Sequence, residues 1–277
     1  MSAPLIPPLF ISHGAPLFAL DPGTTGPALT RWGSELREIA GTPLRGIVIM
    51  SPHWMSRRPA VMTGAQPQTW HDFGGFPAAL YQLQYPAAGD PALAHDVLAR
   101  LNEAGIQAQA DATRPFDHGA WVPLMHLFPQ ADVPVVQVAL PAGAGPADVL
   151  AMGRALSGLR SEGVLVVGSG SMTHNLSEFF GGEREPLPYV LEFSRWIEDA
   201  IARRDVQALL DYRVRAPHAQ RAHPSEDHFL PLFFALGAAG WDEEGGALPE
   251  YLSREVTYGI LAMDSFALRP GPGVIVA

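Results

Sequence analysis

The chain alternates short, very apolar runs with segments of helical periodicity, and this alternation limits its fold more than any other feature. Six runs have the composition of buried strands: Leu5–Ser12, Gly46–Ser51, Ala60–Thr63, Val133–Leu140, Gly163–Gly168 and Glu255–Phe266. Three segments, residues 91–105, 146–163 and 189–205, space their apolar side chains as helices do. The pattern predicts an α/β fold with a mostly parallel central sheet flanked by helices. The weaker alternation of the last run predicts an antiparallel addition to that sheet.

Length and composition favour one compact enzyme-like domain. The 277 residues are 47% hydrophobic and only 17% charged, which is typical of a folded globule with a large core. No repeat or long linker divides the chain, so we expect a single catalytic domain over residues 1–277.

The charged residues and the missing residue types exclude several classes of function. The formal net charge of −10 disfavours non-specific binding to nucleic acid or to an anionic membrane. Cysteine is absent, which excludes disulfides, thiolate nucleophiles and cysteine-ligated metals. Lysine is absent too, so lysine Schiff-base chemistry and a standard phosphate-binding P-loop are excluded.

The first residues and the hydropathy pattern predict a cytoplasmic protein. The stretch "MSAPLIPPLFISHG" lacks the basic region and the long apolar run of a signal peptide. No uninterrupted apolar window reaches the ~18 residues of a membrane span. Whether the chain forms a homo-oligomer is left open by the sequence.

Three histidines follow the ends of predicted strands. His13 comes after "LFIS", His53 after "GIVIMSP", and His174 three residues after "GVLVVGSGS". In open parallel sheets, ligands bind beyond the carboxyl ends of the strands. We therefore expect these histidines to lie together at one edge of the sheet.

Other histidines fall into two groups. His118 in "FDHGAWVPL" and His228 in "HPSEDHFLPL" carry the marks of a site, because the first stands before a glycine and the second is predicted in the first turns of a helix. His223 is five residues before His228, too far around a helix to share its face, so it is expected to cap that helix or line a pocket. Structural positions are predicted for three others: His95 on a helix surface, His126 in the core or half-buried, and His218 in an exposed loop.

A single histidine near a strand end is more often structural than functional. Three such histidines together with one at a helix start, in a chain without cysteine, are what a metal site made of imidazoles requires. The joint pattern therefore favours a metal centre.

Six motifs together resemble a known family. "SHGAP", "SPHW", "HDFGGFPAALYQLQYPAAG", "FDHGAWVPL", "SGSMTHNL" and "HPSEDHFLPL" are similar in order and spacing to motifs of the class III extradiol ring-cleavage dioxygenases. The resemblance is strongest to the DOPA 4,5-dioxygenase type, within the superfamily of protocatechuate 4,5-dioxygenase β subunits. It covers the chain from about Leu5 to Phe266.

The resemblance implies roles for five histidines. It implies that His13, His53 and His228 bind one divalent metal, that His174 is the catalytic acid and base, and that His118 joins it in the substrate pocket. The third ligand of the wider superfamily is usually a glutamate, whereas the matching position here is His228, as in the DOPA type. Iron(II) suits the family's chemistry, and three imidazoles also suit zinc, so either ion is expected in the isolated protein.

The segment "TWHDFGGFPAALYQLQYP" leaves two interpretations open. Its aromatic residues either pack into the core as ordinary loop residues do, or form a lid that excludes water from a bound ring. On the second interpretation His71 and Phe76 contact the substrate, and His223 completes the substrate-binding set.

Three functions remain in competition. The resemblance implies an extradiol dioxygenase that cleaves a catechol-type, DOPA-like ring with O2. A zinc hydrolase would use the same three histidines to activate water, with His174 or Glu226 moving protons. A binding protein on the same fold would bind catechol without turnover. Oxygen consumption separates the first from the other two.

Overall fold

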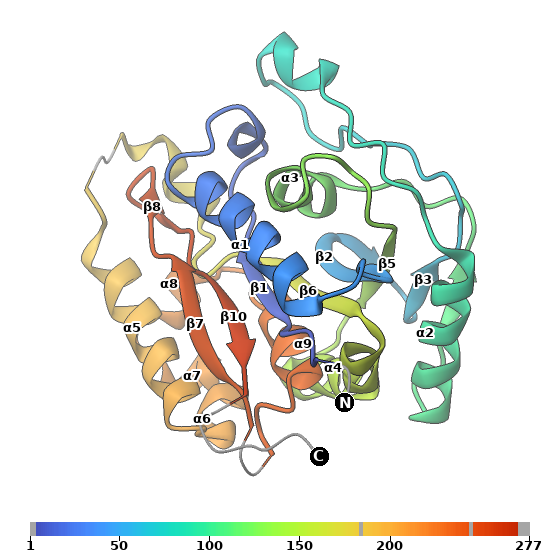
Figure 1. The fold of residues 1–277 in the computed structure, drawn as a ribbon. Coiled ribbons are helices and arrows are strands. Elements are labelled where there is room, and N and C mark those ends of the chain that lie inside the picture. The colour runs from blue at the N-terminus through green and yellow to red at the C-terminus, as the bar shows by residue number, and fades with distance from the viewer. Residues whose placement is uncertain (1–3, 183–184, 244–245, 271–277) are drawn as a thin grey trace.

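The computed structural model describes residues 4–182, 185–243 and 246–270, and within them one eight-stranded sheet dominates (Figure 1). Its strand order is β4-β3-β5-β2-β6-β1-β10-β7. These strands are β1 (Leu9–Ser12), β2 (Gly46–Ser56), β3 (Ala60–Met62), β4 (Gln109–Asp111), β5 (Val135–Pro141), β6 (Val164–Gly170), β7 (Leu248–Ser253) and β10 (Ser265–Arg269). A small hairpin of β8 (Val256–Thr257) and β9 (Leu261–Ala262) forms a second sheet.

Four central strands run parallel, and both edges of the sheet contain antiparallel pairs. Strands β5, β2, β6 and β1 pair in parallel. On one side β3 is antiparallel to β5, and on the other β10 is antiparallel to both β1 and β7. The predicted fold class, a mostly parallel sheet with an antiparallel addition, is confirmed.

Helices cover both faces of the sheet. They are α1 (Thr25–Ala40), α2 (Pro91–Glu103), α3 (His118–Leu127), α4 (Pro146–Ala155), α5 (Pro188–Ala202), α6 (Val206–Leu210), α7 (Tyr212–Arg215), α8 (Ala219–Ala222) and α9 (Pro231–Ala238). Short 3-10 helices lie at η1 (Pro16–Ala19), η2 (Ala78–Gln82), η3 (Ser157–Glu162) and η4 (Leu176–Gly181). Among the described residues, no helix is long and apolar enough to cross a membrane.

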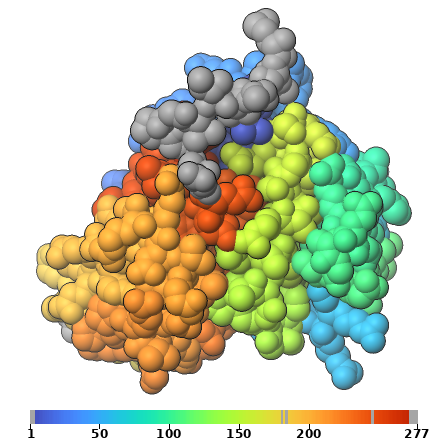
Figure 2. Space-filling model, turned by 90° about the horizontal axis from the view of Figure 1, so that it is seen from below, coloured from blue at the N-terminus to red at the C-terminus, as the bar shows by residue number. Residues whose placement is uncertain are grey.

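The strands alternate their side chains between two apolar cores. In β2, Ile47 and Ile49 pack into the core under α1 and α3, whereas Val48 and Met50 pack into the core under α2, α4, α5 and α9. Successive strand residues point to opposite faces, and a strand buried on both faces is therefore apolar throughout. Figure 2, from below, shows α2 (green), the segment of α4 and η3 (yellow-green) and the orange helices α5 to α7 side by side on this face of the molecule.

Several predicted boundaries were wrong, and the differences have physical causes. Strand β2 continues to Ser56, with a register shift between Ser51 and Met55, so His53 lies in an irregular part of the strand rather than beyond it. Pro52 has no N–H to donate, which explains a break in the ladder at this point. The run Glu255–Phe266 is not one strand, because it contains β8, β9 and the start of β10.

The excursion between β3 and α2 carries the predicted lid segment. Residues 63–90 leave the sheet, pass through η2 and return to Pro91, and in Figure 1 this cyan segment extends beyond the top of the sheet, near α3. The histidine-bearing loops after β1 and β6 lie at the same end. The fold therefore brings the segment to the edge where the site was expected.

Candidate metal centre and substrate cavity

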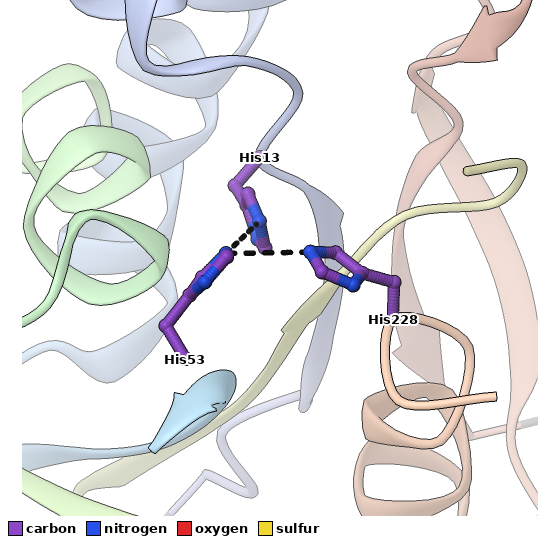
Figure 3. A group of neighbouring side chains, drawn as sticks. All are labelled: His13, His53 and His228. Atoms are coloured by element: carbon purple, nitrogen blue, oxygen red, sulfur yellow. Dashed lines mark hydrogen bonds between the residues drawn. The ribbon is translucent and has the colours of Figure 1, made fainter. Parts of the chain in front are cut away.

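Three histidines from distant parts of the chain point their Nε2 atoms at one another (Figure 3). His13 follows β1, His53 lies in the irregular part of β2, and His228 precedes α9. The Nε2 atom of His53 is 3.2 Å from that of His13 and 3.3 Å from that of His228. The sequence predicted this grouping.

Hydrogen bonds fix the orientation of two of these rings. Ser169 donates its hydroxyl hydrogen to the Gly119 carbonyl at 2.5 Å, so its oxygen accepts from His13 Nδ1 at 3.0 Å. Asp227 accepts from His228 Nδ1 at 2.6 Å. Each ring then carries its hydrogen on Nδ1 and presents a lone pair at Nε2.

The Nε2 lone pairs of His13 and His228 both face the Nε2 of His53, and a cation between the three nitrogens would satisfy them all. The single hydrogen that His53 Nε2 could donate satisfies only one of its two neighbours. A divalent ion with metal–nitrogen bonds of about 2.1 Å spaces its ligands about 3.0–3.4 Å apart, which matches the two nitrogen pairs that include His53. The three residues therefore fit a single metal ion.

Burial keeps the imidazoles of His13 and His53 neutral, the form that binds metals. His13 is only 1% exposed, and burial followed by the neighbouring His53 and His228 lowers its pKa well below the usual value. Burial, His118 and His228 lower the pKa of His53 as well. Burial opposes ionisation of Asp227, but the hydrogen bond from His228 outweighs it and lowers the pKa of that carboxyl, which remains an anion beside the centre.

The sequence predicted His228 within the first turns of a helix, and this prediction was wrong. The residue occupies a turn, and α9 begins three residues later at Pro231. Proline is favoured in the first turn of a helix, which explains the later start. The His228 carbonyl accepts the Ser171 N–H at 2.8 Å, so the turn is attached to the end of β6.

His174 lies beside the three converging histidines. Its ring stacks on that of His228, with 3.5 Å between centroids and 6° between planes. Its backbone N–H donates to the Ala222 carbonyl at 2.8 Å, which positions the loop after β6. Burial, then His228 and His223, lowers the pKa of His174, so this imidazole is neutral and can accept a proton.

His118 is the first residue of α3 and packs against His53, with 3.8 Å between the ring centroids. Asp72, from the lid segment, accepts hydrogen bonds from both the backbone N–H and the Nδ1 of His118, at 2.9 and 3.0 Å. Burial alone would raise the pKa of Asp72, but these bonds lower it, so the carboxylate is ionised. The sequence showed Asp72 within a motif but gave no sign of this partner.

A cavity of about 350 Å³ opens beside the histidines, within the usual range for small-molecule sites. Its walls contain the imidazoles of His53, His118, His174 and His228. The other lining residues are Gly14, Ala15, Pro16, Phe73, Phe76, Leu176, Phe179 and Leu261. Phe76, predicted to contact substrate, is therefore part of the cavity wall.

His71 and His223, both predicted to bind substrate, do not line this cavity. The Nε2 of His71 is hydrogen-bonded to the Leu83 carbonyl at 3.0 Å, and its ring packs against Phe73 and Trp121. His223 is fully buried behind the site, with its Nε2 bonded to the Met172 carbonyl at 2.8 Å. Both rings are used to hold backbone segments next to the cavity.

The remaining histidines occupy the structural positions that the sequence predicted. His95 is exposed on α2, and His126 is half-buried with its Nε2 bonded to the Phe18 carbonyl at 3.0 Å. His218 is exposed and pairs with Glu192.

Comparison with known proteins identifies the family. Residues 7–262 match the model described as the catalytic LigB subunit of aromatic ring-opening dioxygenase. The chain belongs to this family. The class III extradiol resemblance and the predicted enzyme class, an aromatic ring-opening dioxygenase, are confirmed.

Two relatives of this LigB-family chain are named as dioxygenases of the same kind as the family description. It is 37% identical to a protein of Beta vulgaris named 4,5-DOPA dioxygenase extradiol, over 83% of this chain and 86% of that one. It is 35% identical to a protein of the same name from Escherichia coli, over 87% and 88% of the two chains. A crystal structure of an uncharacterized protein from Escherichia coli K12 matches with a TM-score of 0.76 and 27% identity, covering 95% of this chain and 99% of that one.

A half-buried arginine connects two parts of this LigB-family site. Arg114 donates to the His53 carbonyl at 3.0 Å and to the Asp117 carboxylate at 2.8 Å. Its guanidinium lies between the rings of Trp54 and Trp70, about 5 Å from each centroid. Asp117 is fully buried and accepts the Ala120 N–H at the start of α3, so Arg114 connects the His53 backbone to the helix that carries His118.

Replacing Arg114 by methionine should weaken both the fold and metal binding. The buried Asp117 carboxylate would lose its cation, which costs about 3–5 kcal/mol for such pairs, and metal affinity should fall about 10–100-fold. Urea unfolding and metal titration measure the two effects. Arg37→Met, which breaks an exposed pair with Asp132, is the control and should cost less than about 1 kcal/mol. Equal losses of unfolding free energy and of metal affinity in the two variants would contradict a special role for Arg114.

Proposed function

We propose that the chain opens the ring of a catechol-type, DOPA-like substrate with O2, at one divalent metal held by His13, His53 and His228. The observation that carries the proposal is the convergence of three Nε2 atoms, two of them with a fixed lone pair, beside a cavity that His174 also lines. Residues 1–277 act as a single catalytic domain, and we place the enzyme in the cytoplasm.

Iron(II) is the ion we assign to the active enzyme, and zinc is a second ion that the three imidazoles accept. When bound, iron(II) would supply Lewis acidity toward the two catechol oxygens and the redox chemistry that joins O2 to the ring. Three protein ligands would leave room on the cavity side for the diol and O2. A fourth protein ligand would reduce that space.

The surrounding side chains handle the proton and the ring. His174 accepts a proton from one catechol hydroxyl, and the negative charge left on the substrate then stabilises the resulting imidazolium. After cleavage His174 returns a proton to the product. His118, held by Asp72, presents its Nε2 to the cavity and can hydrogen-bond a substrate oxygen. Phe73 and Phe76 pack on the ring and exclude water.

The overall reaction balances without another reactant. One carbon–carbon bond beside the diol breaks, and both atoms of O2 enter the product. The ring carbon that bore a hydroxyl becomes a carboxylic acid, and its former neighbour becomes an aldehyde. The catechol supplies the electrons that reduce O2, so no external reductant is consumed.

An oxygen-uptake assay tests the proposal. The purified chain is stripped of metal, loaded anaerobically with iron(II) or with zinc, and mixed with a panel of catechols in the presence of O2. The iron(II) form should consume one O2 for each yellow ring-opened product. A zinc hydrolase would ignore O2, and a binding protein would bind catechol without turnover, so either result would contradict the proposal.

Phe76→Ala should weaken catechol binding without removing the metal. Phe76 lines the cavity and packs against Phe73 at 5.4 Å between ring centroids, so its loss opens the cavity to water. Loss of such an aromatic contact costs about 0.5–1.5 kcal/mol in addition to the energy of the lost apolar burial, which predicts a KM raised roughly tenfold. Because water then reaches the site, oxygen uptake should also exceed product formation. Steady-state kinetics with metal analysis measure this, and wild-type kinetics would show that the segment is only scaffold.

A further inference from the structure

The walls of the cavity are apolar wherever they are not imidazole. The non-histidine lining consists of small residues from the loop after β1, two phenylalanines of the lid segment, and Leu176, Phe179 and Leu261. Among the described residues, no arginine, aspartate or glutamate lines the cavity. The imidazoles are engaged near the metal centre, so the remaining wall is the surface that a ring substituent meets.

The mouth of the cavity is apolar as well. Leu176 is 52% exposed and Tyr258 is 38% exposed. The Tyr258 ring packs on Phe179 with 4.7 Å between centroids, so it extends the apolar wall outward. A substituent that reaches out of the cavity on this side therefore still contacts apolar side chains.

Among the described residues, the charged groups of η4 and of the inner side of the cavity are already paired. Arg221 binds both carboxylate oxygens of Glu178, at 2.9 and 3.1 Å, and lies over the ring of Tyr189. On the inner side, the carboxylates of Asp72 and Asp227 are held by His118 and His228. Because the chain contains no lysine, a permanently charged partner for a substrate carboxylate would have to be an arginine, and no described arginine lines the cavity.

Within the DOPA-like substituted catechols of the proposed function, we propose that the preferred substrate carries an uncharged, apolar substituent in place of the charged amino-acid side chain of DOPA itself. A carboxylate on the substituent would lose water against apolar walls without gaining a partner, and an ammonium group would be desolvated in the same way. An alkyl or ester substituent would instead bury apolar surface against Phe73, Phe76 and Leu176. The proposal rests on the proposed ring-opening function and specifies its substrate class.

Matched substrates test this charge discrimination. The iron(II)-loaded enzyme is assayed with 3-(3,4-dihydroxyphenyl)propionate and its methyl ester, which differ in one negative charge, and with dopamine and 4-propylcatechol, which differ in one positive charge. DOPA completes the set. The uncharged member of each pair should have the higher kcat/KM, by about tenfold or more, with most of the difference in KM. A kcat/KM for the acid or for DOPA equal to that of the uncharged substrates would overturn the proposal.

A charge added at the mouth should shift the preference. Leu176→Arg places a guanidinium on an exposed position of the cavity wall and should raise kcat/KM for the acid relative to the ester at least about fivefold. Leu191→Arg, at a 45% exposed leucine on α5 that does not line the cavity, adds the same charge elsewhere and should leave the ratio unchanged. An equal shift in both variants would indicate a general charge effect and would contradict the assignment of Leu176 to the substrate wall.

The two proposals fail in different ways. If no catechol is converted by the iron(II)-loaded chain, the proposed function itself is wrong. If all of the catechols are converted and the charged ones are used equally well or better, ring opening stands and only the inferred substrate class is wrong.

Discussion

The His13→Ala variant should lose bound metal and nearly all ring-opening activity. His13 is almost fully buried, its Nδ1 is held by Ser169, and its Nε2 points to the centre, so its removal leaves only two of the three converging nitrogens. The metal supplies several kcal/mol of charge stabilisation in such reactions, which predicts a fall in kcat of about 10³-fold or more. Metal analysis by mass spectrometry after iron(II) loading, together with oxygen uptake, measures both losses.

His95→Ala is the matched control for that variant. It removes an imidazole from the exposed face of α2, far from the centre in the fold, and should keep both metal and activity. A His13→Ala protein that still binds one iron(II) per chain would contradict the assignment of His13 as a ligand.

The His174→Ala variant should keep its metal and lose most turnover. The His174 ring stacks beside His228 and is not one of the three whose nitrogens converge, so metal binding does not depend on it. A general acid and base contributes about 10²–10⁴-fold to the rate, and kcat should fall by that factor. Anaerobic binding of a catechol, followed by its absorbance, should remain close to that of the wild type. Loss of metal together with activity would show that His174 is a fourth ligand.

The sequence predicted those elements whose apolar pattern has a clear period. Strands β1, β2, β5 and β6 are buried on both faces and therefore read as unbroken apolar runs. Helices α2 and α5 each bury one face, which gives the 3.6-residue spacing. Helix α3 is apolar on nearly all sides, so it shows no such period and was not predicted as an element. Helix α9 is equally apolar; a helix was expected there, but its start was placed too early.

The grouping of the histidines could be predicted because it follows from topology. His13, His53 and His174 come from neighbouring strands β1, β2 and β6, whose carboxyl ends meet at one edge of the sheet. His228 joins them through the turn before α9, and family motifs rather than spacing indicated its role. Its position outside the helix depends on Pro231, whose effect on the helix start was not recognised.

The partners of these histidines could not be predicted, because they come from distant parts of the sequence. Ser169 is 156 residues from His13, Asp72 is 46 residues from His118, and Arg114 is 61 residues from His53. Only the folded chain brings each donor to its acceptor. For the same reason, His71 and His223 lie in the predicted segments, but their rings turn to the backbone carbonyls of Leu83 and Met172 rather than to the cavity.

The source of the oxygen atoms in the product tests the central proposal most directly. The iron(II)-loaded enzyme is given a catechol under ¹⁸O₂ in ordinary water, and the ring-opened product is analysed by mass spectrometry. The new carboxylate, which does not exchange with water, should carry one ¹⁸O atom for each O2 consumed. A product whose new oxygen comes from water would contradict a dioxygenase and would assign these three histidines to a hydrolytic centre.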